Sequence, residues 1–298
     1  MLTYTTVCSS RDRAAWLAAR RTGIGASEIA AVLGISPWKS RWALWADKRG
    51  LVADSDLAAE REAVAWGNLL ETAVAEEWAR RADTTVTMRG QLLRSVAHPW
   101  AIATLDATFQ PDGILEVKTT GGLRADDWLD GPPPHYELQV QQQLLVTGAE
   151  RAAIACLIGG QKLAWAWVER DERAIRQIVS AGAAFWELVQ SAVPPETDGS
   201  ESTARALAEA FATDDGATVE LAPELRDACE SIAALKSQRR EVEAAIAERE
   251  NALKAALGPH QRGALPGGWS VSWKTQQWSR PASTGQSRVL RLHAPKER

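Results

Sequence analysis

One stretch, residues 104–118, constrains the fold of this chain more than any other. Two short apolar segments, residues 101–109 and 114–119, flank the tetrapeptide Gln-Pro-Asp-Gly at residues 110–113. Such a tetrapeptide between apolar segments is typical of a tight turn joining two paired strands. The sequence therefore predicts a β-hairpin, and the rest of the fold must accommodate it.

Three charged side chains interrupt this apolar hairpin. Asp106 lies in the first predicted strand and Glu116 in the second, and Lys118 shares a strand face with Glu116 because the two are two residues apart. Two buried carboxylates need a compensating charge. Mg²⁺ or Mn²⁺ would supply it, bound by the carboxylates, the Val117 carbonyl and water, with Lys118 holding the attacking water or stabilising a phosphate. A plain surface salt bridge between Glu116 and Lys118 fits the hairpin equally well.

A glycine-rich turn, residues 22–27, precedes an apolar helical segment near the N-terminus. Free backbone N–H groups and the helix dipole at such a start favour a bound anion. Arg20 or Arg21 upstream and the Ser27 hydroxyl would complete a phosphate site. The competing interpretation is an ordinary helix start with glycines that permit close packing.

Two further predicted helices carry polar residues among apolar ones. In the helix over residues 60–81, Glu71 falls beside the apolar stripe, so its carboxylate is expected to point inward. In the helix over residues 135–146, Gln139 and Gln143 lie one turn apart on one face, where they are expected to hydrogen-bond a phosphate, a base or a metal-bound water. The buried stripe of the first helix is expected to comprise Trp66, Leu69, Leu70, Ala73, Val74 and Trp78.

Composition limits the class of protein. The 298 residues carry a net charge of −4 and contain no apolar run long enough to cross a bilayer and no secretory signal at the start, which predicts a cytoplasmic protein. Three widely separated cysteines show neither metal nor disulfide spacing. Residues 11–50 hold eight basic and three acidic side chains, a local charge of +5, which suits either a DNA-facing surface or a solvated helix face.

The predicted organisation has three parts: an α+β core over residues 1–195, an acidic linker over 196–220 with one short helix over 203–211, and an extension over 221–298. The extension begins with an amphipathic helix over 223–257, whose apolar residues need a partner face within the chain or in another subunit. A tryptophan-rich strand and a basic tail follow. The other elements expected in the core are helices over 12–21, with Ser10 as N-cap, over 41–48 and over 171–191, strands from residue 86, and a second hairpin over 152–169.

Four segments, taken in this order, resemble the YqaJ-like viral recombinase family, the lambda-exonuclease type within the PD-(D/E)xK nuclease superfamily. They are residues 16–27, 67–71, 106–118 and 136–141, and the resemblance covers roughly residues 12–192. It implies an α+β (α/β) fold with a central mixed β-sheet flanked by helices, a restriction-endonuclease-like core, to which the helical C-terminal extension is attached.

The resemblance also implies roles for individual residues. Asp106 and Glu116 would be the main metal ligands, Lys118 the catalytic lysine, and Glu71 a ligand or a contact to metal-bound water. Gln139 matches the glutamine motif of the family, but Gln143 stands where an aromatic residue often closes that motif. The implied contacts to the 5′ phosphate and the DNA are Arg20, Arg21, Ser27, Gln141 and Gln143.

These features lead to one principal hypothesis, a Mg²⁺-dependent exonuclease that digests linear duplex DNA in the 5′→3′ direction in the bacterial host cytoplasm. It would leave 3′ overhangs for a single-strand annealing protein, and the resemblance implies a ring-shaped homo-oligomer. Two alternatives stay open: an endonuclease on the same fold, and a catalytically inactive DNA-end-binding or assembly module whose long helix recruits a partner.

Overall fold

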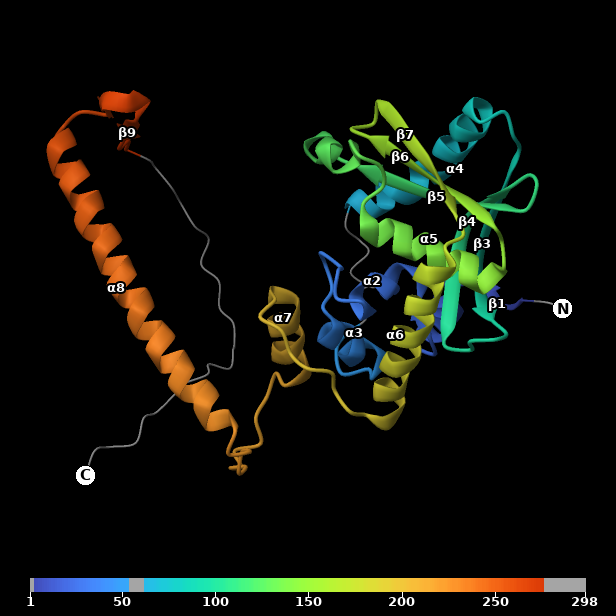
Figure 1. The fold of residues 1–298 in the computed structure, drawn as a ribbon, viewed down its shortest axis with the longest axis horizontal. Helices are drawn as coiled ribbons and strands as arrows, with labels where there is room; N and C mark the ends of the chain where they lie inside the picture. Colours follow the sequence, from blue (N-terminus) through green and yellow to red (C-terminus); the bar gives the residue numbers. More distant parts are fainter. Residues whose placement is uncertain (1–2, 54–61, 276–298) are drawn as a thin grey trace. The chain divides into compact units, whose positions relative to one another are not determined.

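The computed structural model describes residues 3–53 and 62–275, and the chain divides into two compact units, Met1–Phe211 and Ala212–Arg298. A seven-stranded β-sheet forms the centre of the first unit (Figure 1). Its strands, in spatial order, are β1 (Tyr4–Ser9), β3 (Val86–Ser95), β4 (Ala101–Phe109), β5 (Gly113–Thr120), β6 (Arg151–Ile158) and β7 (Lys162–Glu169), and the short β2 (Ile24–Gly25) pairs with β4.

The sheet is mixed, as the sequence predicts. Strands β5 and β6 are parallel because the chain between them crosses over through helix α5 (Pro134–Thr147), and β2 is parallel to β4. The other neighbouring pairs are antiparallel, including the β4–β5 hairpin and the β6–β7 hairpin. The first unit is therefore an α+β fold built around a mixed sheet.

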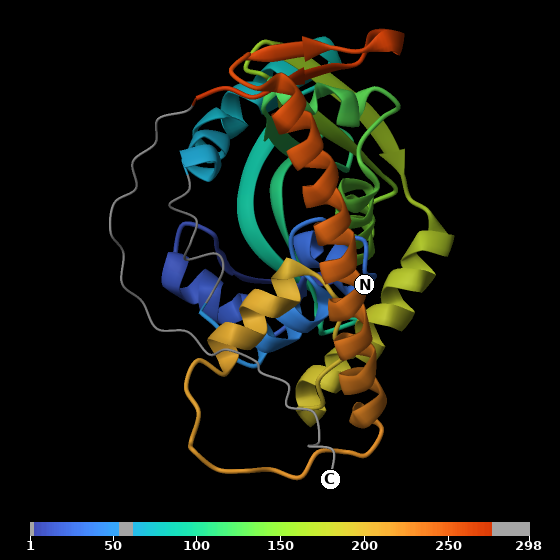
Figure 2. The same cartoon turned by 90° about the vertical axis from the view of Figure 1, so that its left-hand side faces the viewer.

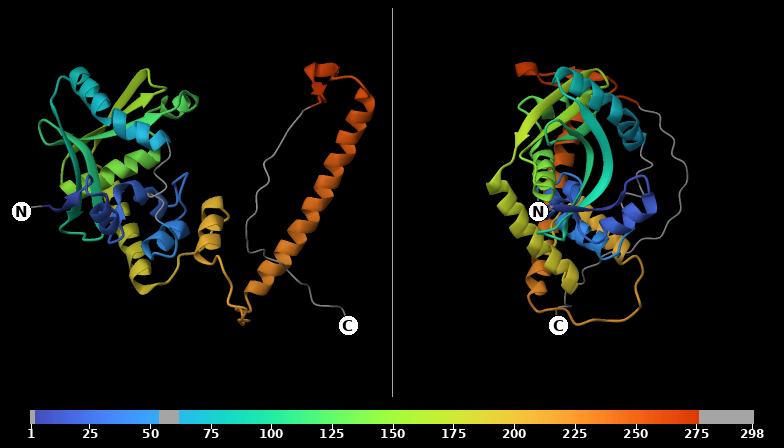
Figure 3. Two further views of the ribbon diagram at one scale, coloured as in Figure 1. Left: turned by 180° about the vertical axis from the view of Figure 1, so that it is seen from behind. Right: turned by 90° about the vertical axis from the view of Figure 1, so that its right-hand side faces the viewer.

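Helices cover both faces of this sheet. The remaining helices of the first unit are α1 (Arg13–Arg20), α2 (Ile29–Val32), α3 (Arg41–Lys48), α4 (Glu62–Arg81), α6 (Glu172–Ser191) and α7 (Glu201–Ala210), with short 3₁₀ turns η1 (Ala26–Glu28) and η3 (Gly122–Trp128). Helix α4 lies on one face and α5 on the other (Figures 1 and 3). The sheet is consequently buried on both sides, and its central strands read as apolar runs.

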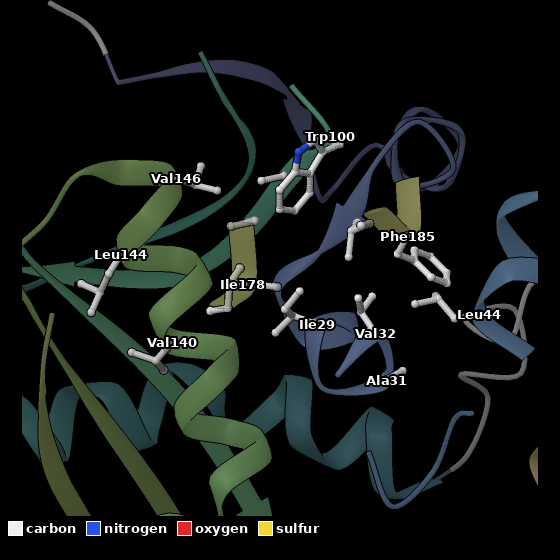
Figure 4. Close-up of a cluster of buried hydrophobic side chains, with 14 of the residues drawn as sticks. Ile29, Ala31, Val32, Leu44, Trp100, Val140, Leu144, Val146, Ile178 and Phe185 are labelled. Atoms are coloured by element: carbon white, nitrogen blue, oxygen red, sulfur yellow. The ribbon is translucent and has the colours of Figure 1, made fainter. Parts of the chain in front are cut away.

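The larger apolar cluster joins α5 to helices α2, α3 and α6. In Figure 4, Ile29, Leu44 and Phe185 lie on one side of this cluster and Leu144 and Val140 on the other. Burial of this many aliphatic and aromatic side chains provides the main stabilisation of the unit.

A glycine permits the closest approach in this cluster. A Cβ on Gly182 in α6 would lie 2.2 Å from the ring of Trp100, so only glycine admits the indole there. Trp100 is itself 8% exposed and also accepts, through its carbonyl, the backbone N–H of Ile24 over 2.7 Å. This contact ties the short strand β2 to the start of β4.

Strands β3 and β4 are strongly curved, as Figure 2 shows. The pairing of β3 with β4 shifts register between Met88 and Gln91, and Gly90 at the shift has a φ of 55°. A bulge of this kind bends a strand and increases its twist. The backbone N–H of Ser10 donates to the Gly90 carbonyl over 2.8 Å, so the bulge also holds the end of β1.

The β4–β5 turn is held by a second close contact. A Cβ on Gly113 would lie 2.0 Å from the ring of Phe109, so the aromatic ring can lie across the first residue of β5 only because that residue is glycine. The predicted hairpin is confirmed, and the strand ends are fixed by this pair across a loop of residues 110–112.

Two local expectations about helices are wrong. The N-cap of α1 is Asp12, whose carboxylate accepts the backbone N–H of Ala15 over 3.1 Å, and not Ser10. In α4, Trp66 is 54% and Leu69 71% exposed, and Ala73 is exposed as well, although all three were expected in the buried stripe. The buried residues of α4 all lie in its second half, where Trp78 contacts Phe109, Trp165 and Trp167.

The short helix expected over 203–211 is present as α7 (Glu201–Ala210), but it belongs to the first compact unit, so the predicted linker over 196–220 is wrong for its first half. Helix α7 packs on α3, and the first compact unit continues to Phe211. Thr203 is 1% exposed, and its hydroxyl lies 2.8 Å from that of Ser40, while Ser202 accepts the backbone N–H of Ser40 over 3.0 Å. Because Ser40 is also the N-cap of α3, α7 completes the start of that helix.

The second unit consists of α8 (Leu225–Leu257), a small antiparallel pair of strands, β8 (Arg262–Ala264) and β9 (Ser270–Ser272), and the turn η4 (Pro266–Gly268). The long helix confirms the amphipathic segment expected over 223–257. The basic tail over 280–298 and the end of the tryptophan-rich segment lie outside the described residues. Within the described ranges, no helix combines the length and apolar character needed to span a bilayer.

Candidate active site

The site begins where strands β4 and β5 separate. Their pairing runs from Phe109–Gly113 to Ala107–Leu115 and then stops, so Asp106 and Glu116 are the next residues on the two strands. The backbone N–H of Val117 donates to Oδ2 of Asp106 over 2.8 Å, so a side chain provides the acceptor that a paired strand would otherwise supply. The end of the pairing therefore brings the two predicted carboxylates together.

Glu116 is 3% exposed and is held by three donors. Its Oε1 accepts from the Lys118 ammonium over 2.5 Å and from the Gln139 amide over 2.5 Å, and its Oε2 accepts from the Gln143 amide over 2.5 Å. A carboxylate offers about four acceptor positions, so these described bonds leave one on Oε2. Glu116 and Lys118 lie on the same face of β5, as predicted, but their ion pair is largely buried and is not a surface salt bridge.

Glutamine side chains of α5 bond the Glu116 carboxylate and backbone groups of the fold. Two expected substrate contacts, Gln141 and Gln143, are therefore wrong. Gln143 is fully buried and bonds Glu116, with a second, longer bond to the Thr104 carbonyl at 3.3 Å. Gln141 is turned to the β7–α6 connection, where it donates to the Glu169 carbonyl over 2.7 Å and accepts from the Asp171 N–H over 3.0 Å. The Gln141 amide bonds the protein on both sides, and the buried Gln143 amide donates to protein oxygens, so neither supports a DNA contact.

Negative charge accumulates around the hairpin. Burial raises the pKa of Asp106 well above its ordinary range, and the neighbouring Glu116 carboxylate raises it further. Burial and the Glu116 charge likewise raise the pKa of Glu71 on α4. Burial lowers the pKa of Lys118, but the charges of Glu116 and Asp106 outweigh it and leave that pKa raised, so the ammonium stays protonated at neutral pH. One lysine thus faces three carboxylates.

This donor set fits a divalent cation. Oxygen ligands suit Mg²⁺ and Mn²⁺, and the pKa values of Asp106 and Glu71 are raised by burial and by the Glu116 charge, both of which a bound cation would offset. Among the described residues, no three His, Cys, Asp or Glu side chains already converge as a complete ligand shell. A cation here would be held by Asp106 and Glu116, and water, the Val117 carbonyl and Glu71 would be its further ligands.

A cavity of about 780 Å³ opens in front of these residues. Its walls come from β4, from α4, and from the turn that follows α1. Asp106, Glu71, Gln139, Arg20 and Ser27 all line it. The structure therefore brings together in one cavity five of the predicted site residues, whereas Glu116, Val117 and Lys118 are not among the residues that line it.

Arg20 is fixed in this wall from two sides. Its guanidinium lies 4.7 Å above the ring of Trp16, and it forms a 2.7 Å ion pair with Glu28, which is 6% exposed. Glu28 also bonds Lys48 over 2.7 Å and the Gly25 N–H over 2.6 Å. Burial raises the pKa of Glu28, but the Lys48 and Arg20 cations outweigh it, so its pKa is lowered and it is ionised.

The other two N-terminal residues predicted to bind a phosphate, Ser27 and Arg21, differ in whether they line the cavity. Ser27 is exposed and lines the cavity at η1, one residue before Glu28, where the glycine-rich turn was expected to meet a helix. The residue after Arg20 is Arg21, which is exposed at the C-cap of α1 and is not among the cavity-lining residues, so it is separated from the predicted phosphate site.

Several site residues were missed by the sequence analysis. Asn68 lines the cavity one turn before Glu71 on α4, and that three-residue spacing was available as a signal. Arg13 also lines the cavity, and its guanidinium lies 4.7 Å above the ring of Trp16. The buried role of Glu28 had no local signal, because it depends on Lys48 from a different helix.

Comparisons with known proteins identify the family and the fold. A family model described as the YqaJ-like viral recombinase domain matches residues 15–150. The chain is 33% identical over 272 residues to the uncharacterized protein YqaJ of Bacillus subtilis (strain 168), a match that covers 89% of this chain and 84% of that protein.

Solved structures share the fold. The crystal structure of an alkaline exonuclease, LHK-Exo, from Laribacter hongkongensis is similar with a TM-score of 0.52 and 21% identity, over 60% of this chain and 93% of that one. Its complex with dAMP is similar with a TM-score of 0.51 and 22% identity over the same shares. The mixed sheet with flanking helices is thus an exonuclease-like fold, as the sequence predicts, and the chain belongs to the YqaJ-like viral recombinase family.

Proposed function

We propose that this protein is a metal-dependent deoxyribonuclease that digests linear duplex DNA from its 5′ ends and leaves 3′ single-stranded overhangs. One observation carries the proposal: a single cavity holds carboxylates suited to a cation, Asp106 and Glu71, and cationic and hydroxyl groups suited to a phosphate, Arg20 and Ser27. Exonuclease activity and dAMP binding belong to the Laribacter enzyme by its description, and the shared fold supports extending a nuclease activity to this chain.

In this proposal Arg20 and Ser27 receive the terminal 5′ phosphate. The Arg20 guanidinium is oriented by Trp16 and Glu28, so little side-chain freedom is lost when a phosphate binds. Guanidinium and hydroxyl groups are suited donors to phosphate oxygens. A terminal phosphate held here would set the first phosphodiester of the strand beside Asp106.

Lys118 acts as a cation and not as a base. Its raised pKa keeps the ammonium protonated, and its nitrogen lies 4.9 Å from the centre of the Tyr136 ring and 2.5 Å from Glu116. A fixed ammonium at this place orients the attacking water and stabilises negative charge that develops on the phosphate. Gln139 and Gln143 hold the Glu116 carboxylate in one orientation through their amide N–H groups.

A divalent cation, Mg²⁺ or Mn²⁺, held by Asp106, Glu116, the Val117 carbonyl and Glu71, would supply an acidified water and a Lewis acid toward the phosphate. The overhang left by such an enzyme is the substrate of a single-strand annealing protein, which we therefore propose as its partner. We place the reaction in the bacterial host cytoplasm and, from the family, in a ring-shaped homo-oligomer.

The experiment is a digestion assay on linear duplex DNA labelled at either end, carrying a 5′ phosphate or a 5′ hydroxyl, with Mg²⁺ or with EDTA. The proposal expects release of label from the 5′ end, faster for the phosphorylated substrate, and no digestion in EDTA. Covalently closed circular duplex serves as the control substrate and should stay intact. Cleavage of the circle would indicate an endonuclease, and end binding without hydrolysis would indicate an inactive module.

A further inference from the structure

Helix α8 exposes an apolar face that the described part of its own unit does not cover. Of its 33 residues, only Leu257 is buried, against the β8–β9 strands, whereas Leu235, Val242 and Ile246 are 60%, 57% and 50% exposed. Helices in water draw most of their stability from packing such a face. A helix about 50 Å long, at 1.5 Å per residue, therefore needs a partner along its length.

The apolar residues follow a seven-residue repeat. The first series of core positions, spaced by seven, holds Leu225, Ile232, Arg239, Ile246 and Leu253, and the second holds Ala228, Leu235, Val242, Arg249 and Ala256. Two series offset by three residues and repeated every seven form the seam of a left-handed coiled coil. The partner that fits this surface is therefore another helix with the same repeat.

We propose that α8 pairs with α8 of a second copy of this chain, in antiparallel orientation, to form a two-stranded coiled coil. A pair of this kind is isologous, because the same face is used by both copies and the contact closes with twofold symmetry. The inference goes beyond the nuclease function and does not depend on it.

Charge inside the seam selects the antiparallel orientation. In a parallel, in-register pair, Arg239 would face Arg239 of the other copy and Arg249 would face Arg249, which places like charges together at two core layers. In the antiparallel pair centred between Arg239 and Val242, these two residues face each other across the copies, which puts the two Arg239 side chains in adjacent layers about 4.5 Å apart along the axis, and Arg249 faces Ile232. The arginine stems can then lie along apolar neighbours while their charged ends reach solvent.

Side-chain size also matches in the antiparallel register. Leu225 faces Ala256 of the second copy, and Ala228 faces Leu253, so a large residue meets a small one at each outer layer. The layer nearer the centre pairs Leu235 with Ile246, both of which are at least half exposed in the single chain. Large-against-small alternation lets facing layers interdigitate.

Charge beside the seam is complementary as well. The flanking position on one side holds Cys229, Lys236, Glu243 and Glu250. In the antiparallel register, Lys236 lies beside Glu243 of the second copy, and the symmetry repeats this ion pair, while Cys229 lies beside Glu250. The opposite flank holds only uncharged residues, Ser231, Gln238, Ala245 and Ala252, so a parallel pair would form no ion pair between the two flanks.

The test uses the full-length chain with Glu250→Cys, oxidised with copper–phenanthroline and read on a non-reducing denaturing gel. Antiparallel pairing places the new thiol beside Cys229 of the second copy, and we expect at least about tenfold more linked dimer than for the wild-type chain, with peptide mapping of a 229–250 link. Within one helix these positions are about 31 Å apart, so the link can form only between copies. The denaturing gel makes the result independent of any assembly formed by the core.

The wild-type chain is the matched control. In the antiparallel pair, the two Cys229 thiols are separated by about 35 Å along the axis, so the wild type should not link. Absence of the 229–250 link, or a link joining equal positions, would overturn the inference. Absence is also the result expected if α8 instead binds an annealing protein or the core of its own chain.

A charge exchange in the Glu250→Cys background provides the second measurement. Lys236→Glu alone or Glu243→Lys alone creates two like-charge contacts across the copies, and we expect link formation to slow about fivefold or more. The double variant restores opposite charges and should recover the original rate to within about twofold. Equal rates for all four proteins would contradict the antiparallel register.

Discussion

Val117 donates its backbone N–H to Asp106 across 2.8 Å at the point where β4 and β5 stop pairing. The Asp106 side chain therefore has two roles: it accepts a backbone hydrogen bond at the end of the strand pairing, and it places a negative charge in the hairpin. These two roles can be separated, because asparagine keeps an acceptor oxygen and loses the charge.

Asp106→Asn should abolish DNA digestion and raise the melting temperature of the protein in EDTA. Removing a carboxylate whose pKa is raised by burial and by Glu116 relieves repulsion, and a gain on the order of 1 kcal/mol corresponds to about 2–4 °C. Added Mg²⁺ should stabilise the wild type and not the variant, because binding to the folded state raises stability. Scanning calorimetry with and without Mg²⁺ checks this, and equal Mg²⁺ shifts would contradict the ligand role.

Lys118→Ala should lower the digestion rate by about 100-fold or more, because a fixed cation near the scissile phosphate is lost. Binding of a 5′-phosphorylated end, measured by anisotropy in Ca²⁺, should change little. Lys162→Ala on the exposed start of β7 is the matched control and should retain full activity. A fully active Lys118→Ala protein would remove the proposed mechanism.

Gln139→Ala and Gln141→Ala should separate catalysis from stability on one helix. Gln139 supports Glu116, so its loss should lower kcat by about tenfold. Gln141 bonds only the backbone of the β7–α6 connection in the described structure, so its loss should cost about 1–3 kcal/mol of unfolding free energy and leave kcat unchanged. Denaturant unfolding and initial rates measure the two effects, and the reverse pattern would refute these assignments.

Glu28→Gln should destabilise the protein by about 3–5 kcal/mol, because it leaves Arg20 and Lys48 as buried cations without their shared carboxylate. It should also reduce the preference for 5′-phosphorylated over 5′-hydroxyl ends, since Arg20 loses its orientation. Glu77→Gln, which breaks an exposed set of ion pairs on α4, is the control and should change neither property. An unchanged end preference in Glu28→Gln would remove the positioning role.

The two carboxylates should give opposite pH dependences. The pKa of Glu28 is lowered below its ordinary 4.5, so its contribution to stability is present above pH 4.5 and is lost as the pH falls toward the lowered pKa. The pKa of Asp106 is raised above its ordinary 3.8, so its charge is costly at neutral pH and the cost disappears as the pH falls toward 3.8.

The measurement is the melting temperature of the wild type minus that of each variant, in EDTA, as a function of pH. The advantage of the wild type over Glu28→Gln should be constant down to about pH 4.5 and shrink below it. The advantage of Asp106→Asn over the wild type should shrink as the pH falls from neutral toward 3.8. A gap that widens in acid for either variant would contradict the corresponding shift.

The hairpin and its charged residues were predictable because the signals are local. Turn residues, strand alternation and the two-residue spacing of Glu116 and Lys118 lie within a few positions of one another. The glutamine contacts were not predictable in detail, because the bonds of Gln139 and Gln143 to Glu116 depend on how the β5–β6 crossover places α5 over the sheet.

Other expectations failed where packing overrides periodicity. Helix α4 carries apolar residues on several sides, so its pattern did not show that Trp66 is exposed while Trp78 is buried. Helix α7 lies in an acidic, weakly patterned segment, and its place in the core depends on Thr203 reaching Ser40. The burial of Glu28 likewise needs Lys48, twenty residues further along the chain.

The contact of Phe109 with Gly113 has a consequence for catalysis. Because the Phe109 ring fits only over a glycine, this contact fixes the pairing of Phe109 with Gly113 across the three-residue loop over 110–112. The length of the loop thereby sets which residue of β4 lies opposite Glu116. Inserting one residue would turn Asp106 to the opposite face of the sheet, since side chains alternate along a strand. A loop that touches no substrate thereby decides whether the two carboxylates meet.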